Sequence, residues 1–247
     1  RSKEDARVCI MTTLVIPDIH ERLDRLQMAL AGRVEKADRI ILLGDHFDTF
    51  DRWDEKRVKD VCSFVRTNIG GFFYEPEALE VTGHIIPTTF LLGNHDCHLF
   101  FSHNGFKCSG YQNRTQAIVD EMIPDEVRDQ FAISTRVGPY LVSHAGYTEW
   151  TLQYCKPEVE AEALKLAKEG KFHPLFGAGH ARGGSQRVGG PTWLDWNNEF
   201  EHIDDIPQIV GHTQGKNVRA KGKPKEHSHV SETGDIIIEM GLMSYCL

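Results

Sequence analysis

Polar side chains that could bind metal ions or transfer protons follow a short apolar run near the middle of this sequence. Residues 89–92 (Thr-Phe-Leu-Leu) lead into Gly93, and Asn94, His95 and Asp96 come next. An apolar run that stops at glycine is typical of a buried strand that ends in a tight turn. Taken alone, such a motif is more often a turn with structural polar residues than a functional site.

Four other segments repeat this order of a β-prone apolar run and a polar cluster. The runs cover residues 12–16, 39–43, 140–143 and 208–210, and the clusters are Asp18-Ile19-His20, Gly44-Asp45-His46-Phe47-Asp48, His144-Ala145-Gly146 and Gly211-His212-Thr213. A sixth run, residues 235–240, predicts a strand without a cluster. Apolar residues at helical spacing predict helices over residues 21–34, 55–68, 117–131 (interrupted at Pro124) and 157–170.

Strands that alternate with helices predict an α/β fold, in which polar residues past the strand ends converge on one crevice. Six of these residues are candidate metal ligands, namely Asp18, His20, Asp45, Asn94, His144 and His212. Carboxylate, amide and imidazole ligands together favour Mn, Fe or Zn over Mg or Ca, which prefer oxygen ligands alone. Six ligands divide naturally between two ions, which lie about 3.5–4 Å apart in hydrolases with two-metal sites.

In this order, the five motifs resemble the calcineurin-like metallophosphoesterase superfamily. Its pattern is Asp-x-His, Gly-Asp-x-x-Asp, Gly-Asn-His-(Asp/Glu), His and Gly-His, and here the motifs span about residues 14 to 213. Within the superfamily, the chain looks most similar to the serine/threonine protein phosphatases and their bacterial and phage relatives, including the diadenosine tetraphosphatase type. Three segments carry that similarity: residues 142–146 (Val-Ser-His-Ala-Gly), Gly211-His212-Thr213, and the Trp-x-Asp sequence at Trp193 to Asp195.

The resemblance implies two mixed β-sheets packed together with helices outside, and a dinuclear-metal-dependent phosphoester hydrolase. A hydroxide that bridges the two ions would attack phosphorus, His95 would protonate the leaving oxygen as general acid, and Asp48 would hold the far nitrogen of His95. We expect a phosphomonoesterase first, with a phosphorylated small molecule, a nucleotide or a phosphoprotein as substrate. The alternative is a nucleotide phosphodiesterase or dinucleoside polyphosphate hydrolase. A non-catalytic scaffold is disfavoured because all six ligands and His95 are present.

One motif departs from the phosphatase pattern, which continues Gly-Asp-x-x-Asp with an Arg-Gly that grips the substrate phosphate. Here Thr49 and Phe50 follow Asp48. Three arginines are candidates to replace the missing side chain, although each could simply be a surface residue: Arg52, Arg182 and Arg187. The last two lie in a glycine-rich stretch, residues 176–191, which we expect to be a loop. Residues 216–234, polar and partly basic, predict a second loop with a solvated tip.

Several other polar residues near these motifs have two interpretations. Cys97, His98, His103 and Cys108 could in principle bind structural zinc. Their spacing is not a standard zinc pattern, however, and Phe100, Phe101 and Phe106 favour an aromatic lid or a packing loop. We expect His46 to be a packed loop residue and Asp96 to be a turn or helix cap.

The length, net charge and cysteine content of the chain predict its domain organisation, its partners and its location. With 247 residues, 40% of them hydrophobic, the chain can bury a substantial core, and we expect a single domain over residues 1–247. Residues 1–10 would be an extension or an expression remnant, with Met11 as a candidate start. The net charge of −8 disfavours binding to duplex nucleic acid. Six scattered cysteines, no apolar leader and no run of about 20 apolar residues predict a cytoplasmic protein with reduced thiols and no membrane association.

Overall fold

Two mixed β-sheets form the centre of the fold in the computed structural model, which describes residues 11–74, 84–101, 107–215, 218–222, 229–230, 236–237 and 244–246. The first sheet has the order β1 (Thr13–Ile16), β2 (Arg39–Leu42), β4 (His84–Phe90) and β3 (Gly70–Tyr74). The second has the order β5 (Ser134–Val137), β6 (Tyr140–Ser143), β7 (Gln208–Val210), β11 (Ser244–Cys246) and β8 (Arg219–Lys221). A separate ribbon pairs β9 (His229–Val230) with β10 (Ile236–Ile237).

The strands that carry the polar clusters are parallel neighbours. β1, β2 and β4 run parallel in the first sheet, and β6 and β7 run parallel in the second. Their carboxyl ends therefore lie at the same edge of each sheet, as the sequence predicted. The antiparallel strands β3, β5 and β8 are outermost strands of the two sheets.

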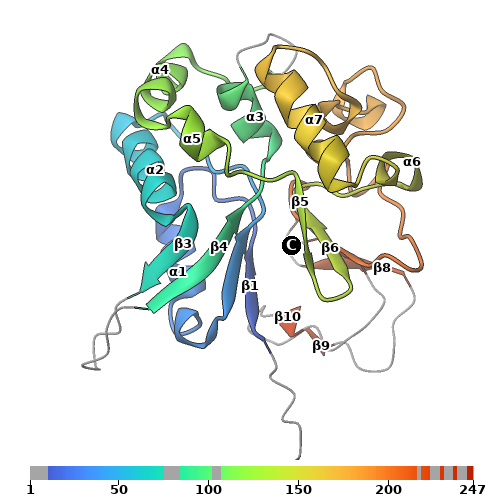
Figure 1. Cartoon of the computed structure of the whole chain (residues 1–247), viewed down its shortest axis with the longest axis horizontal. Coiled ribbons are helices and arrows are strands. Elements are labelled where there is room, and N and C mark those ends of the chain that lie inside the picture. The colour runs from blue at the N-terminus through green and yellow to red at the C-terminus, as the bar shows by residue number, and fades with distance from the viewer. Residues whose placement is uncertain are drawn as a thin grey trace, which may run out of the picture.

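Helices cover the outer side of the first sheet and one end of the fold, with α2, α3, α4, α5 and α7 above the sheets in the view of Figure 1. The helices are α1 (Leu23–Leu30), α2 (Glu55–Asn68), α3 (Asn94–Phe100), α4 (Asn113–Met122), α5 (Asp125–Arg128), α6 (Glu149–Leu152) and α7 (Pro157–Lys168). Short 3₁₀ turns occupy η1 (Val34–Lys36), η3 (Pro174–Phe176) and η4 (His180–Arg182). α2 has the bounds predicted from its spacing, and Asp54 caps it by accepting a hydrogen bond from the backbone NH of Lys56.

The alternation of side chains along β2 shows how the two sheets pack. Ile40 and Leu42 belong to the hydrophobic cluster that includes the buried faces of α1 and α2. Ile41 and Leu43, which point to the opposite side, pack in a second cluster with Leu91 and with residues of the other sheet, namely Tyr140, Val142 and Ile209. Because both faces of β2 are buried, its sequence is a continuous apolar run rather than an alternating one.

The predicted α/β fold with two packed sheets is confirmed, and the differences concern local elements. Asn94 begins helix α3 directly, where the sequence suggested a tight turn, with Asp96 as a turn residue or a helix cap. Pro124 separates α4 from α5, as expected. The stretch of residues 176–191 is folded around Glu199, whose carboxylate accepts hydrogen bonds from the backbone NH groups of Ala181 and Gly189, both at 3.0 Å.

Some sequence-based predictions lie wholly or partly outside the described residues. These are the extension at residues 1–10, the side chains of His103 and Phe106, most of the loop at residues 216–234, and the strand at residues 235–240 apart from β10. Within the described ranges, no helix combines the length and the apolar character needed to cross a bilayer. The cytoplasmic location and the single domain over residues 1–247 stay predictions.

Candidate metal centre

The turns that follow the parallel strands are strained. Among the described residues, those with a positive φ that are not glycine are His20 (44°), Glu21 (61°), Asp45 (50°), Asp48 (62°) and His212 (65°). A non-glycine residue in this region costs on the order of 1–3 kcal/mol and persists only where its surroundings hold it. Four of the five are side chains that the sequence proposed for the site, so the strain is concentrated where function is expected.

Two of these turns are packed backbone against backbone. A Cβ on Gly44 would lie 2.4 Å from the backbone nitrogen of Gly93, and one on Gly93 would lie 2.1 Å from Oδ1 of Asp45. Glycine is therefore required at both positions. Fully buried Asp96 joins the turns, because its carboxylate accepts hydrogen bonds from the backbone NH groups of Gly93, Asp45 and His46, each at 2.9 Å. Asp96 is thus the predicted helix cap and also a brace between the turns.

Five of the six predicted ligands form a chain of close contacts through Asp45 and His144. Oδ2 of Asp45 lies 3.4 Å from Nε2 of His144 and 3.8 Å from Nε2 of His20. The same nitrogen of His144 lies 3.3 Å from Oδ1 of Asn94 and 3.1 Å from Nδ1 of His212. Asp45 therefore belongs to two ligand groups at once, Asp45-His144-His212 and Asp18-His20-Asp45.

Asp18 completes the second group and connects the two sheets. Its carboxylate oxygens accept hydrogen bonds from the backbone NH of His212 at 3.2 and 3.1 Å, and Oδ1 lies 3.7 Å from Nδ1 of His144. A Cβ on Gly211 would lie 2.6 Å from the same oxygen, so glycine before His212 keeps room for the carboxylate. The structure thus brings all six predicted ligands together.

The electrostatics of the metal-free chain fit a site for cations. Burial raises the pKa of Asp18, while His144 holds the pKa of Asp45 well below its usual value against the opposing effect of burial. Burial lowers the pKa of His144, but the charges of Asp45 and Asp18 outweigh it and raise that pKa to about 9. Burial and the neighbouring His144 hold the pKa of His212 well below its usual value. Buried carboxylates and imidazoles this close need a shared proton or a metal ion between them.

His95 lies beside the ligands but is bound to another carboxylate. Its Nδ1 is 3.0 Å from Oδ2 of Asp48, and its backbone NH donates to Oδ1 of Asp45 at 2.9 Å. Burial lowers the pKa of His95, but the charge of Asp45 and the hydrogen bond to Asp48 outweigh it and raise the pKa to about 11 in the metal-free chain. In the metal-free chain, Asp45 and Asp48 together therefore favour the protonated form of His95.

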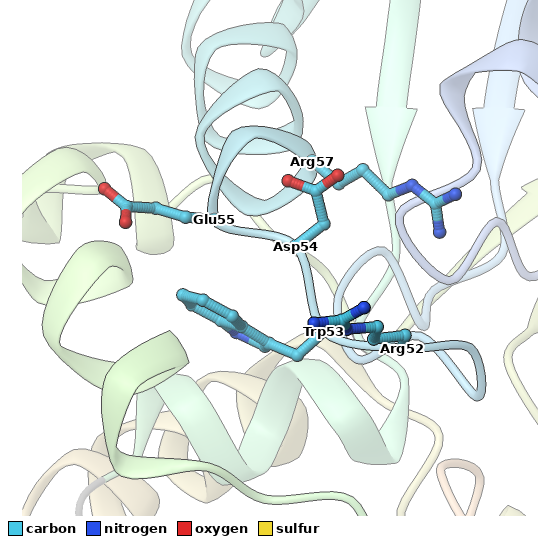
Figure 2. A pocket seen from close by; sticks show the side chains of 5 residues that line it. All are labelled: Arg52, Trp53, Asp54, Glu55 and Arg57. Atoms are coloured by element: carbon cyan, nitrogen blue, oxygen red, sulfur yellow. The ribbon is translucent and has the colours of Figure 1, made fainter.

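A pocket of about 420 Å³ opens onto these residues. It is lined by His20, Asp45, Phe50, Asn94, His95, Ser109, Arg182, Trp193, Asp195, Asn197, His212, Thr213 and Gln214. Of the three candidate arginines, Arg182 lines this pocket. Arg187 is exposed and does not line it, and Arg52 lines a different pocket with Trp53, Asp54, Glu55 and Arg57 at the start of α2 (Figure 2).

Residues 11–215 match the family model of calcineurin-like phosphoesterases. The chain belongs to the calcineurin-like phosphoesterase family. It is therefore a metal-dependent hydrolase of phosphoesters, as the resemblance implied. A comparison with curated protein sequences finds no match.

Two solved structures share the fold at low sequence identity. The cold-active protein-tyrosine phosphatase of a psychrophilic Shewanella species is 16% identical, with a TM-score of 0.53 over 85% of this chain and 67% of that chain. A second structure of a cold-active protein tyrosine phosphatase is 15% identical, with a TM-score of 0.51 over 85% of this chain and 66% of that chain. The phosphoesterase described here thus spans about two thirds of their length.

Two carboxylates that support the site of this phosphoesterase were not predicted from the sequence. Buried Glu21 accepts a hydrogen bond from the backbone NH of Asp48 at 3.1 Å, and burial raises its pKa to about 7. Asp195 lies 2.9 Å from Nε of Arg182. A glutamate at the start of a predicted helix is an ordinary first-turn residue, so no sequence pattern indicated that Glu21 supports the site. Asp195 had one, because it lies in the Trp-x-Asp sequence.

Proposed function

We propose that this phosphoesterase hydrolyses phosphomonoesters with two divalent ions, Mn, Fe or Zn, held by Asp18, His20, Asp45, Asn94, His144 and His212. Asp45 supports this number, because its carboxylate belongs to both ligand groups and could bridge two ions. When bound, such ions neutralise charge on the phosphoryl oxygens and lower the pKa of water toward 7. Imidazole and carboxylate ligands together suit these metals.

The observation that carries the proposal is the pairing of His95 with Asp48, because His95 lines the same pocket as the predicted ligands His20, Asp45, Asn94 and His212. Because Nδ1 of His95 is engaged by Asp48, Nε2 is the nitrogen that can carry a proton to a leaving oxygen. Asp48 in turn fixes the orientation of the ring and favours its charged form. These two residues therefore supply the general acid that an alkoxide leaving group needs.

Arg182 supports a monoester substrate, because a terminal phosphate carries more charge than a diester and needs a further cation. Its Nη2 donates to Oγ1 of Thr213 at 2.8 Å, and its Nε lies 2.9 Å from Oδ2 of Asp195. Asp195 also accepts hydrogen bonds from the backbone NH groups of Asn197 and Asn198. The guanidinium is thus held at the pocket wall, where it can take the role of the arginine missing after Asp48.

Arg182→Ala is expected to lower kcat/KM for a phosphomonoester by about 10- to 100-fold, the loss of one hydrogen-bonded charge worth about 1.5–3 kcal/mol. Steady-state kinetics with p-nitrophenyl phosphate measure this effect. Arg187→Ala is the matched control, because Arg187 comes from the same stretch but does not line the pocket. A comparable loss in Arg187→Ala or Arg52→Ala, with Arg182→Ala unaffected, would assign the phosphate contact to another arginine.

A substrate panel tests the proposed reaction against its alternative. The metal-loaded chain is given p-nitrophenyl phosphate, its bis-ester, a phosphopeptide and a dinucleoside polyphosphate, and kcat/KM is compared. We expect higher values for the monoesters. A preference for the bis-ester or the dinucleotide would instead indicate a nucleotide phosphodiesterase or dinucleoside polyphosphate hydrolase that uses the same ligands.

A further inference from the structure

A second group of metal-binding side chains lies next to His95, outside the six ligands described above. Sγ of Cys108 is 2.9 Å from Nδ1 of His98 and 3.7 Å from Nδ1 of His95. His95 and His98 are three residues apart on α3, so their side chains share one helix face. Asp48 contacts both rings, through its hydrogen bond to His95 and a close contact between its Oδ2 and Nε2 of His98.

We propose that Cys108, His95 and His98 bind a third divalent ion of the zinc class, with Asp48 beside them. Tetrahedral zinc holds sulfur at about 2.3 Å and nitrogen or oxygen at about 2.0–2.2 Å, so neighbouring ligand atoms lie roughly 3.3–3.6 Å apart. The distance from His95 Nδ1 to Cys108 Sγ is 3.7 Å, and that to Asp48 Oδ2 is 3.0 Å. His98 contacts Cys108 Sγ through Nδ1 at 2.9 Å and Asp48 through Nε2. One ion can therefore take Nδ1 of His98 together with Cys108 and His95 after a small separation of His98 from Cys108, and Asp48 stays outside this set.

The burial of this cluster argues for an ion rather than for hydrogen bonds alone. His95, His98 and Asp48 are all nearly inaccessible to solvent, and Oδ1 of Asp48 is buried without a hydrogen-bond partner. Buried polar atoms without partners are rare and require an explanation, of which an ion is one. A thiol and two imidazoles supply three protein ligands for zinc, which leaves the fourth position for water.

The sulfur ligand distinguishes this site from the main one. The six ligands around Asp45 offer only oxygen and nitrogen, which suit manganese and iron as well as zinc, whereas thiolate selects zinc or cobalt over manganese. The sequence suggested zinc for a different set that included Cys97. In the structure Cys97 is buried in the hydrophobic core, and His95 takes its place beside His98 and Cys108.

An ion at this position would inhibit hydrolysis. It would occupy Nδ1 of His95 and replace the hydrogen bond of that nitrogen to Asp48, so the ring could no longer be held as a protonated imidazolium. This consequence rests on the proposed role of His95 as general acid, whereas the binding of the ion does not. Zinc would therefore support activity at the main site and suppress it at the second.

Cobalt titration of the full-length, metal-free chain tests the site without any assay of activity. A thiolate bound to Co²⁺ gives a near-ultraviolet charge-transfer band that oxygen and nitrogen ligands do not give. We expect the wild type to develop this band, Cys108→Ser to lose it, and Cys155→Ser, a change at another half-buried cysteine, to retain it. No band in the wild type, or a band that survives in Cys108→Ser, would overturn the proposal.

Two further measurements cover the case in which Cys108→Ser fails to fold, as circular dichroism would show. The affinity for Co²⁺, measured from the growth of this band, is expected to fall by at least about tenfold in His98→Gln. An unchanged affinity would overturn the proposal. In the Mn²⁺-loaded chain, the Zn²⁺ concentration for half inhibition should rise at least about tenfold in His98→Gln and stay unchanged in Cys155→Ser. If the band forms but zinc does not inhibit, the site is retained and the acid role of His95 fails.

Discussion

Asp45→Asn is expected to lower kcat by at least about 10³-fold, because bound ions contribute several kcal/mol to phosphoryl transfer and each 1.36 kcal/mol is tenfold in rate. Asp45 belongs to both ligand groups, so its loss weakens two ion sites at once. Asparagine tolerates the positive φ of 50° at this position, and its Oδ1 can still accept the hydrogen bond from His95, so the fold should remain. Elemental analysis of the Mn²⁺-loaded variant should find less than one manganese ion per chain.

Asp51→Asn is the matched control, because it makes the same chemical change in the exposed part of the loop after the second strand. It should keep both ions and full activity. His144→Asn, which removes a fully buried ligand, should resemble Asp45→Asn. If Asp45→Asn keeps two ions and wild-type activity, the ligand assignment around Asp45 is wrong.

His95→Asn is expected to lower kcat by about 10²–10⁴-fold on alkyl phosphates, the range for a lost general acid. The loss should shrink with p-nitrophenyl phosphate, because p-nitrophenolate leaves without a proton. Both ions should remain bound, since Nδ1 of His95 is engaged by Asp48 and its ring meets His20 edge to face, with the ring centroids 5.2 Å apart. Kinetics with the two leaving groups, together with metal analysis, separate the acid role from a ligand role.

Asp48→Asn should act in the same direction but more mildly, through the orientation and charge of His95. Its φ of 62° is again compatible with asparagine. Loss of one of the two ions from the Mn²⁺-loaded His95→Asn variant would make His95 a ligand of the main site. Full activity of His95→Asn on an alkyl phosphate would make it a bystander and assign the proton to another group.

The parallel strands and their polar clusters could be predicted because each apolar run is buried on both faces and ends at a turn. Ile40 to Leu43 illustrate this, since alternate residues face helices and the second sheet. The convergence of Asp18, Asp45, Asn94, His144 and His212 follows from the parallel arrangement of these strands, which local patterns indicate well.

Contacts between segments distant in sequence could not be predicted in the same way. The approach of Cys108 to His95 depends on the path of the chain after α3, and the place of Arg182 depends on loop packing around Glu199 and Asp195. No local sequence pattern indicates the contact of Cys108 with His95 or the position of Arg182. The hydrogen bonds that Asp96 accepts from Asp45 and His46 could not be predicted either, because they join turns about fifty residues apart in the sequence.

Titration of the metal-free chain with Mn²⁺, followed by both bound metal and hydrolysis of p-nitrophenyl phosphate, tests the dinuclear site most directly. Manganese disfavours thiolate ligands, so the Cys108 site should not contribute to the count. Activity should be absent without metal, rise with added Mn²⁺ and saturate at two ions per chain. Activity that persists in the metal-free chain, or that is complete at one bound ion, would contradict the account.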